Sequence, residues 1–275
     1  MRPQLQSIMG CLVRNGGQKP SRTDIVGKVL EMRSAILADI HSNLAAFQAV
    51  LEDLHERGAV DEIWCLGDVV GYGPNPRECI QLLRQHNHLC VPGNHDWAAI
   101  GNIDTSYFNP EAAAACQWTA EKLTSDDTDY LRSLPLTLRQ GAFTLVHGSP
   151  REPIWEYVLS TQSAQENFAC FDTRFCLIGH SHAPLVFELG QDEVCRFGQL
   201  PAHLSLKKEK ERLIINCGSV GQPRDGDPRA SYAILDTGER TVSHYRIKYD
   251  IALTQQRMRE SGLPSRLISR LSLGW

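Results

Sequence analysis

Five short clusters of aspartate, asparagine and histidine stand out in this chain, and each follows an apolar run. The densest is Gly93-Asn94-His95-Asp96, directly after Cys90-Val91-Pro92. The other clusters are Asp39 with His41, Asp68, His147, and His180 with His182. Such side chains need polar partners when they are buried. Their position at the ends of apolar runs therefore indicates a site rather than a packed core.

The residue types in these clusters suit a pair of divalent metal ions. Imidazole and carboxylate together accommodate manganese, iron, zinc, nickel or cobalt, and we favour manganese. We expect one ion to be held by Asp39, His41 and His182, and the other by Asn94, His147 and His180. Asp68 would bridge the two ions.

Charge accounting for such a site favours an anionic substrate. Two divalent ions and two ligand aspartates leave a formal surplus of about two positive charges, which fits a phosphate ester. Two metals can hold a bridging hydroxide as the nucleophile for phosphate ester hydrolysis. His95 would then act as the general acid that protonates the leaving group, and Asp96 would set the tautomer of His95.

The elements that must position these clusters follow from the apolar pattern. Residues 34–38, 62–66 and 89–91 are predicted strands, and residues 44–57 and 77–85 are predicted helices between them. This βαβαβ alternation is typical of parallel strand pairing in an α/β protein. The carboxyl ends of parallel strands meet at one edge of a sheet, so the clusters can converge there.

The rest of the chain divides into further segments. Residues 97–140 are predicted to be a helical insert, and strands over 142–146 and 175–178 deliver the last two clusters. Five more strands between 186 and 247 are expected to pair in a more antiparallel way. We predict a flexible N-terminal extension over 1–31, a catalytic domain over 32–250 and a C-terminal helical tail over 251–275. Whether 1–31 belongs to the native protein is left open.

The composition of the chain bears on its class of function and on its location in the cell. The 275 residues are 42% hydrophobic and 22% charged, with a formal net charge of -4. This balance can build a full core, and it gives no basic stripe of the kind that binds nucleic acid, although it does not exclude such binding. No apolar run is long enough to cross a membrane. Nine cysteines without a CxxC pair favour reduced thiols in a cytoplasmic protein.

Taken in order, the motifs resemble those of the calcineurin-like metallophosphoesterases over roughly residues 33–250. They are Asp39-x-His41, Gly67-Asp68-x-x-Gly71, Gly93-Asn94-His95-Asp96, His147 and Gly179-His180-x-His182. The resemblance implies a four-layer α/β/β/α sandwich of two mixed sheets with a dinuclear metal centre. The stretch from Asn216 to Pro223 resembles the smaller bacterial and archaeal phosphodiesterase-like branch.

One departure from the family pattern concerns the second motif. Phosphoprotein phosphatases and symmetric dinucleoside tetraphosphatases of the superfamily have an arginine there that helps to bind phosphate. In this chain the corresponding stretch reads Gly71-Tyr72-Gly73, which puts phosphoprotein and dinucleotide substrates in doubt. Arg224, in a later Gly/Pro-rich loop, is a candidate for the same task, with loop bracing as the alternative.

These observations predict a metal-dependent phosphoesterase, with a small phosphodiester as the favoured substrate. The alternatives are a phosphomonoesterase and a non-catalytic metal-binding scaffold on the same fold. The sequence does not show the physiological substrate. It also leaves homo-oligomer formation open.

Overall fold

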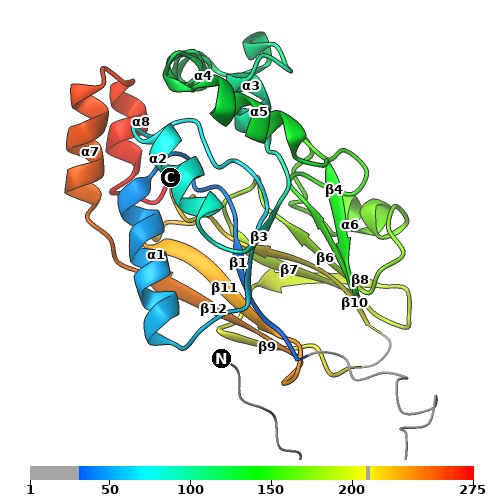
Figure 1. The fold of residues 1–275 in the computed structure, drawn as a ribbon. Helices are drawn as coiled ribbons and strands as arrows, with labels where there is room; N and C mark the ends of the chain where they lie inside the picture. The colour runs from blue at the N-terminus through cyan, green and yellow to red at the C-terminus, as the bar shows by residue number, and fades with distance from the viewer. Residues whose placement is uncertain (1–30, 209–210) are drawn as a thin grey trace, which may run out of the picture. The chain divides into compact units, whose positions relative to one another are not determined.

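Two six-stranded β-sheets form the centre of the structure, a computed structural model that describes residues 31–208 and 211–275 (Figure 1). The first sheet consists of β1 (Arg33–Leu37), β2 (Glu62–Cys65), β3 (His88–Cys90), β9 (His203–Ser205), β11 (Ala230–Asp236) and β12 (Thr241–Ile247). Its strand order is β3-β2-β1-β11-β12-β9. β1 pairs in parallel with β2, and β2 with β3, as the βαβαβ alternation predicts. β1 also pairs antiparallel with β11, so the sheet is mixed.

The second sheet is also mixed. It consists of β4 (Thr137–Gln140), β5 (Phe143–Val146), β6 (Phe175–Ile178), β7 (Pro184–Leu189), β8 (Cys195–Gln199) and β10 (Arg212–Cys217). Its order is β4-β5-β6-β10-β7-β8, with parallel pairs in the middle and antiparallel pairs toward both edges. β5 and β6 therefore point in the same direction, and their carboxyl ends lie side by side.

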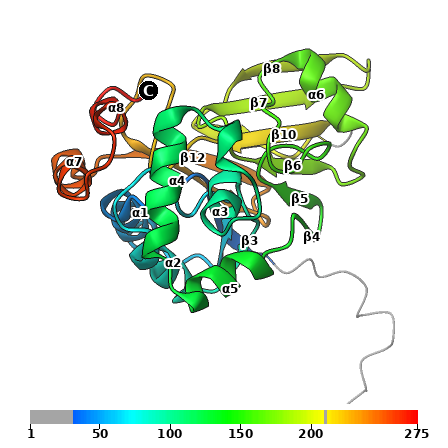
Figure 2. The same ribbon diagram turned by 90° about the horizontal axis from the view of Figure 1, so that it is seen from above.

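Helices connect and cover the strands. They are α1 (Leu44–Glu56), α2 (Pro76–Arg84), α3 (Asn94–Ala99), α4 (Pro110–Lys122), α5 (Ser125–Ser133), α6 (Thr161–Phe168), α7 (Ile251–Glu260) and α8 (Ser265–Arg270), with a 3-10 turn η1 over Thr105–Tyr107. Several begin at side-chain caps that the sequence provides. Asn43 accepts a hydrogen bond from the Ala46 amide at α1, and Asn109 accepts one from the Ala112 amide at α4. Figure 2 shows α4 and α3 side by side, with α6 over the second sheet.

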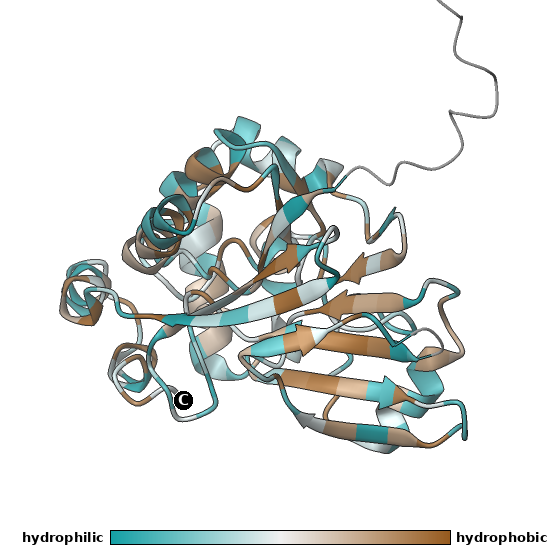
Figure 3. Cartoon of the chain, turned by 90° about the horizontal axis from the view of Figure 1, so that it is seen from below, coloured by the Kyte–Doolittle hydropathy of each residue, from teal (hydrophilic) through white to brown (hydrophobic). Residues whose placement is uncertain are grey.

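The strands alternate their side chains between two apolar cores. In β6, Phe175 and Leu177 face the core between the sheets, whereas Cys176 and Ile178 contribute to the core under α6. The strand β1 divides in the same way between the inter-sheet core and the core under α1 and α2. Figure 3 shows this apolar material concentrated along the middle of the strands. Burial on both faces explains why these strands read as continuous apolar runs.

Four layers result: helices, sheet, sheet, helix. This confirms the predicted α/β/β/α sandwich. The described residues from Glu31 onward form one compact unit. The C-terminal helices are part of it, because Met258 of α7 and Leu267 of α8 pack against Tyr72 and Ala115.

Some elements differ from the predictions. β4 lies in the segment that was predicted to be helical, and β9 was not predicted at all. Both are short edge strands with exposed polar positions, so they carry little apolar periodicity. The predicted N-terminal extension lies outside the described residues, apart from Glu31. Within the described part of the chain, none of the helices is both long and apolar enough to cross a bilayer.

Candidate metal centre

The predicted metal ligands and His95 lie on the segments that follow five strands of the two sheets, either in loops or, for residues 94–96, in the first turn of α3. Asp39, Asp68 and the 94–96 segment follow β1, β2 and β3 of the first sheet. His147 follows β5 of the second sheet, and His180 and His182 follow β6. The loops are held against one another by backbone hydrogen bonds, such as Asp39 N to Gly67 O at 3.0 Å and Gly179 N to His147 O at 2.8 Å. The centre is therefore built from both sheets.

An unusual backbone conformation places many of these side chains. Five of the predicted ligands have φ between 48° and 63°, in the left-handed region: Asp39, His41, Asp68, His180 and His182. This conformation is uncommon for residues other than glycine and costs roughly 1–2 kcal/mol each. Its concentration at these positions indicates that the surrounding fold holds the turns in place so that the side chains converge.

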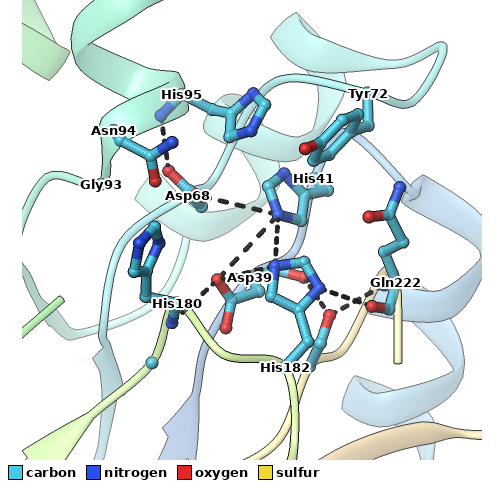
Figure 4. Close-up of polar contacts among 12 residues, drawn as sticks. Asp39, His41, Asp68, Tyr72, Gly93, Asn94, His95, His180, His182 and Gln222 are labelled. Carbon is cyan, nitrogen blue, oxygen red and sulfur yellow. Dashed lines mark hydrogen bonds and ion pairs between the residues drawn. The ribbon is translucent and has the colours of Figure 1, made fainter. Parts of the chain in front are cut away.

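The first group of candidate ligands comprises Asp39, His41, Asp68 and His182, and Figure 4 shows them pointing toward one another. The Nε2 atoms of His41 and His182 lie 3.1 Å apart. The Asp39 Oδ1 atom is 3.4 Å from His182 Nε2, and the Asp68 Oδ2 atom is 3.5 Å from His41 Nε2. All four residues are buried, so this group can enclose an ion.

The second group comprises Asp68, His147 and His180, with Asn94 beside them. The His147 Nε2 atom is 3.2 Å from His180 Nδ1, 3.2 Å from Asn94 Oδ1 and 3.5 Å from Asp68 Oδ2. Asp68 belongs to both groups, and its Oδ2 atom faces a histidine of each. The structure thus brings the seven predicted ligands together in the predicted division.

Each candidate ligand histidine is oriented by a backbone carbonyl. His41 Nδ1 donates to Val70 O at 3.1 Å, and His147 Nδ1 donates to Leu66 O at 2.7 Å. His182 Nδ1 donates to Gln222 O, and His180 Nε2 donates to Trp155 O at 3.1 Å. The other ring nitrogen of each histidine then carries a lone pair directed into the centre, as metal-ligating histidines require.

The donor set fits a metal, as two observations show. Among the described residues, the buried Oδ2 atoms of Asp39 and Asp68 have no hydrogen-bond partner. Lone pairs of His41 and His182 face each other at 3.1 Å, an arrangement that only a shared proton or a cation between them stabilises. A divalent ion would satisfy the carboxylate oxygens and the imidazole nitrogens together.

Burial tunes the protonation of these groups. Burial lowers the pKa of His41, His180 and His182 well below the usual histidine value, and lowers the pKa of His147 to about 4. The imidazoles are therefore neutral and able to bind metal at neutral pH. Burial also raises the pKa of Asp68 to about 7, so the protein without metal holds this carboxylate close to protonation.

His95 lies beside the ligands. Its ring contacts that of His41 edge-on, with the centroids 4.9 Å apart, and it packs against Tyr72 and Phe108. Its Nδ1 atom is 3.2 Å from the sulfur of Cys116 on α4. Its backbone amide donates to Asp68 Oδ1 at 2.8 Å, which ties His95 to the shared ligand.

The role predicted for Asp96 needs a correction. Its two carboxylate oxygens accept hydrogen bonds from the amides of Val70, at 3.0 Å, and Gly93, at 2.9 Å. The second bond caps the start of α3, so Asp96 holds the backbone of two loops instead of setting the tautomer of His95. The contact at the ring nitrogen of His95 is Cys116, which the sequence pattern did not single out.

Glycines allow the loops to approach closely. A Cβ atom at Gly93 would lie 2.0 Å from Asp68 Oδ1, and one at Gly71 would lie 2.7 Å from His95 Nδ1. No side chain fits at either position without displacing a site residue. The glycines of the second and third motifs therefore have a steric function.

Arg224 and two tyrosines complete the surroundings. Arg224 donates to Gln222 Oε1 at 2.8 Å and approaches the Tyr72 hydroxyl at 3.4 Å, while its buried Nε has no partner among the described residues. Tyr157 stacks on the ring of His180 at 3.8 Å. Neither tyrosine was predicted to be a site residue, because an isolated tyrosine carries no spacing signal.

Comparison with known proteins agrees with this geometry. The sequence model of the calcineurin-like phosphoesterase superfamily domain matches residues 32–240. An uncharacterized protein from Methanocaldococcus jannaschii is 39% identical over 245 residues, which cover 87% of this chain and 97% of that protein. A crystal structure of a metallophosphoesterase from Sphaerobacter thermophilus is 47% identical, with a TM-score of 0.80, and covers 89% of this chain and 100% of that one.

A more distant relative is a symmetrical bis(5′-nucleosyl)-tetraphosphatase from Actinobacillus pleuropneumoniae. It is 26% identical over 140 residues, which are 49% of this chain and 51% of that protein. The match thus spans about half of each chain. Together with the family match over most of the described residues, these comparisons show that the chain belongs to the calcineurin-like phosphoesterase superfamily.

Proposed function

We propose that the protein is a phosphoesterase that depends on two divalent metal ions and hydrolyses a small phosphodiester. The observation that carries the proposal is the position of Asp68, whose Oδ2 atom faces one histidine of each ligand group at 3.5 Å. A carboxylate shared in this way suits a pair of ions. When bound, the ions would supply charge neutralisation for the phosphate and activation of the attacking water.

Two residues of the chain would assist the reaction directly, one by donating a proton and one by binding the phosphate. In the reaction, the water oxygen forms a bond to phosphorus, the bond between phosphorus and the leaving oxygen breaks, and that oxygen must receive a proton. His95 would donate this proton, because its ring lies against His41 at the edge of the ligand groups. Burial lowers the pKa of His95 well below its usual value, so the charge of the bound phosphate must raise that pKa before His95 carries the proton. Arg224 would bind a non-bridging oxygen of the phosphate through its unpaired Nε.

The scaffold alternative is less well supported. A protein that only binds metal needs no group to protonate a leaving oxygen. Here the ring of His95 lies against the ligand groups, and the buried Nε atom of Arg224 has no hydrogen-bond partner within residues 31–208 and 211–275. Both features have a use in catalysis.

The experiment that tests the proposal compares bis-p-nitrophenyl phosphate with p-nitrophenyl phosphate, in manganese and in EDTA. We expect turnover of the diester that EDTA abolishes and manganese restores. Preference for the monoester would indicate a phosphatase instead. Bound metal without turnover of either ester would favour the scaffold. Asp68→Asn is the matched variant, and it should lose metal and activity together because it weakens both ligand groups.

Three finer points remain predictions: manganese as the native metal, the preference for diesters and a cytoplasmic location. Metal analysis of the purified protein tests the first, and the ester comparison tests the second. Fractionation of the source cells tests the third.

A further inference from the structure

A cavity of about 570 Å³ lies beside the metal centre. Its lining includes Tyr72, Tyr157 and Arg224, which contact the ligand groups or their neighbours, and Arg270 and Trp275 from the C-terminal end of the described chain. The volume is that of a small-molecule site. It is larger than one phosphate group needs, so a further part of a ligand can occupy it.

The C-terminal segment that forms one wall of the cavity is fixed to the domain. The Gly226 amide donates to Gly274 O at 3.0 Å, which joins this segment to the loop that carries Arg224. Leu267 and Leu271 of the same segment pack in one apolar cluster with Tyr72. Arg224 and Arg270 are therefore held in the same cavity by packed elements.

The cavity has an excess of positive charge. Arg224, Arg266 and Arg270 line it, whereas Glu111 is the acidic residue in its lining. The Glu111 Oε1 atom lies 3.9 Å from Nη1 of Arg266, and the side chain of Arg266 is 82% exposed. Arg224 forms no ion pair with a carboxylate among the described residues, and it donates to Gln222 Oε1. Arg270 donates from Nε to a main-chain oxygen of Trp275, the last residue of the sequence, which leaves its Nη1 and Nη2 nitrogens for an anion.

Holding the guanidinium groups of Arg224 and Arg270 in one cavity is electrostatically unfavourable unless an anion lies between them. Burial and the neighbouring charge of Arg224 lower the pKa of Arg270 to about 10. An anionic group between them would relieve this repulsion. Guanidinium groups suit phosphate in particular, because their donors match its oxygens in pairs.

We propose that this cavity binds a second phosphate group of the substrate, on the part that stays attached to the scissile phosphate, through Arg270 together with Arg224. The inference rests on the proposed function, since it places the scissile phosphate at the metal centre. The substrate class is then a small phosphodiester whose retained part carries a further phosphate. Tyr157 and Trp275, which are 45% and 65% exposed, offer ring faces to a planar group between the two phosphates.

Two chromogenic diesters that differ in one phosphate test the inference. They are the p-nitrophenyl ester of thymidine 5′-phosphate and the same ester with a 3′-phosphate. Both release p-nitrophenolate, and both leave the nucleoside on the scissile phosphate. We expect the manganese-loaded protein to show a kcat/KM about tenfold or more higher for the bisphosphate, mainly through KM, because charge-assisted bonds to a half-buried arginine are strong.

The variant Arg270→Gln should bring the ratio of the two kcat/KM values close to one. Arg259→Gln is the matched control, because it removes an equal charge from an exposed position on α7 outside the cavity. It should keep the ratio of the unaltered protein. Thermal melts of both variants check folding. Equal kcat/KM values for the two esters, or an unchanged ratio in Arg270→Gln, would overturn the inference.

A binding measurement separates this inference from the proposed function. Adenosine 3′,5′-bisphosphate and adenosine 5′-monophosphate are titrated into the manganese-loaded protein by calorimetry. Tighter binding of the bisphosphate that is lost in Arg270→Gln supports the second phosphate site, even if no ester is hydrolysed. Equal affinities refute that site, even if esters are hydrolysed.

Discussion

The four candidate ligand histidines share one arrangement, in which a backbone carbonyl accepts a hydrogen bond from one ring nitrogen and the other nitrogen faces the centre. A carbonyl does not titrate, so the tautomer of each imidazole is set by the fold across the working pH range. This makes the donor geometry a property of the loops. It also explains why the sequence did not predict the hydrogen-bond partners of these histidines. Every residue type has a backbone oxygen, so these partners leave no sequence pattern.

His95 is the residue with the sharpest prediction. It lies beside the ligand groups without belonging to either, so His95→Ala should keep both metal ions and lose kcat by about 10²–10⁴. The loss should be greater for esters with poor leaving groups, since these most need a proton. Steady-state rates over a series of substituted phenyl esters, with metal content measured in parallel, check this.

The control for that experiment is His86→Ala, at an exposed position after α2 and away from the ligand groups. It should change neither the rate nor the metal content. Full activity in the His95→Ala protein would remove the general-acid assignment. Loss of metal from that variant would instead make the ring of His95 part of the structural support for the ligand groups, through its contact with His41.

At the scale of the element, the site depends on how closely loops from the two sheets approach. The segment from Asn94 to Asp96 is the first turn of α3, and Gly93 is its N-cap. Asp96 closes this cap and binds the loop after β2 at the same time. One acidic residue thus fixes the distance between the loops that carry Asp68 and Asn94.

Gly93→Ala tests that close approach. A methyl group there would lie 2.0 Å from Asp68 Oδ1 and 2.5 Å from Asp68 N, so the loop must move and carry the shared ligand with it. We expect weaker metal binding and a loss of roughly 1–3 kcal/mol in the free energy of unfolding. Metal titrations and denaturant melts measure the two effects.

Gly198→Ala is the matched control, because a Cβ atom at Gly198 has open space around it and this glycine lies on the edge strand β8. It should change stability and metal affinity little. Equal effects of the two substitutions would mean that the general cost of losing a glycine, and not contact with Asp68, explains the Gly93 result.

At the scale of the whole molecule, the sequence predicted the layers and which candidate ligand side chains lie near one another. Five apolar runs buried on both faces, each ending in a polar cluster, were enough for that. Other features depend on contacts between distant segments. The left-handed turns at Asp39 and Asp68, the Cys116 contact of His95 and the cavity wall that carries Arg270 have no local pattern. The edge strands β4 and β9 were missed because their exposed positions are polar.

Metal binding should be coupled to proton release, because the whole fold buries the shared carboxylate. The pKa of Asp68 is raised to about 7, so at pH 6 the metal-free protein holds a proton there that binding must displace. His147, with its pKa lowered to about 4, is already neutral at pH 6 and releases none. Calorimetry of manganese binding at pH 6, in two buffers of different ionisation enthalpy, should therefore show the release of about one proton from Asp68. Asp39 should contribute further proton release, because burial raises its pKa as well.

The same shift determines how the stabilisation by metal changes with pH. An acid whose pKa is raised on folding destabilises the metal-free protein progressively as pH rises from about 4 through 7, because the buried carboxylate must ionise. The metal-bound protein does not bear this cost, so the increase in Tm on adding manganese should be larger at pH 8 than at pH 6. At pH 8.5 the proton release should be much smaller, since Asp68 is then already ionised. Equal heats of binding in both buffers at pH 6 would show that Asp68 is already ionised before metal binds. The surroundings of Asp68 would then lower its pKa by more than burial raises it.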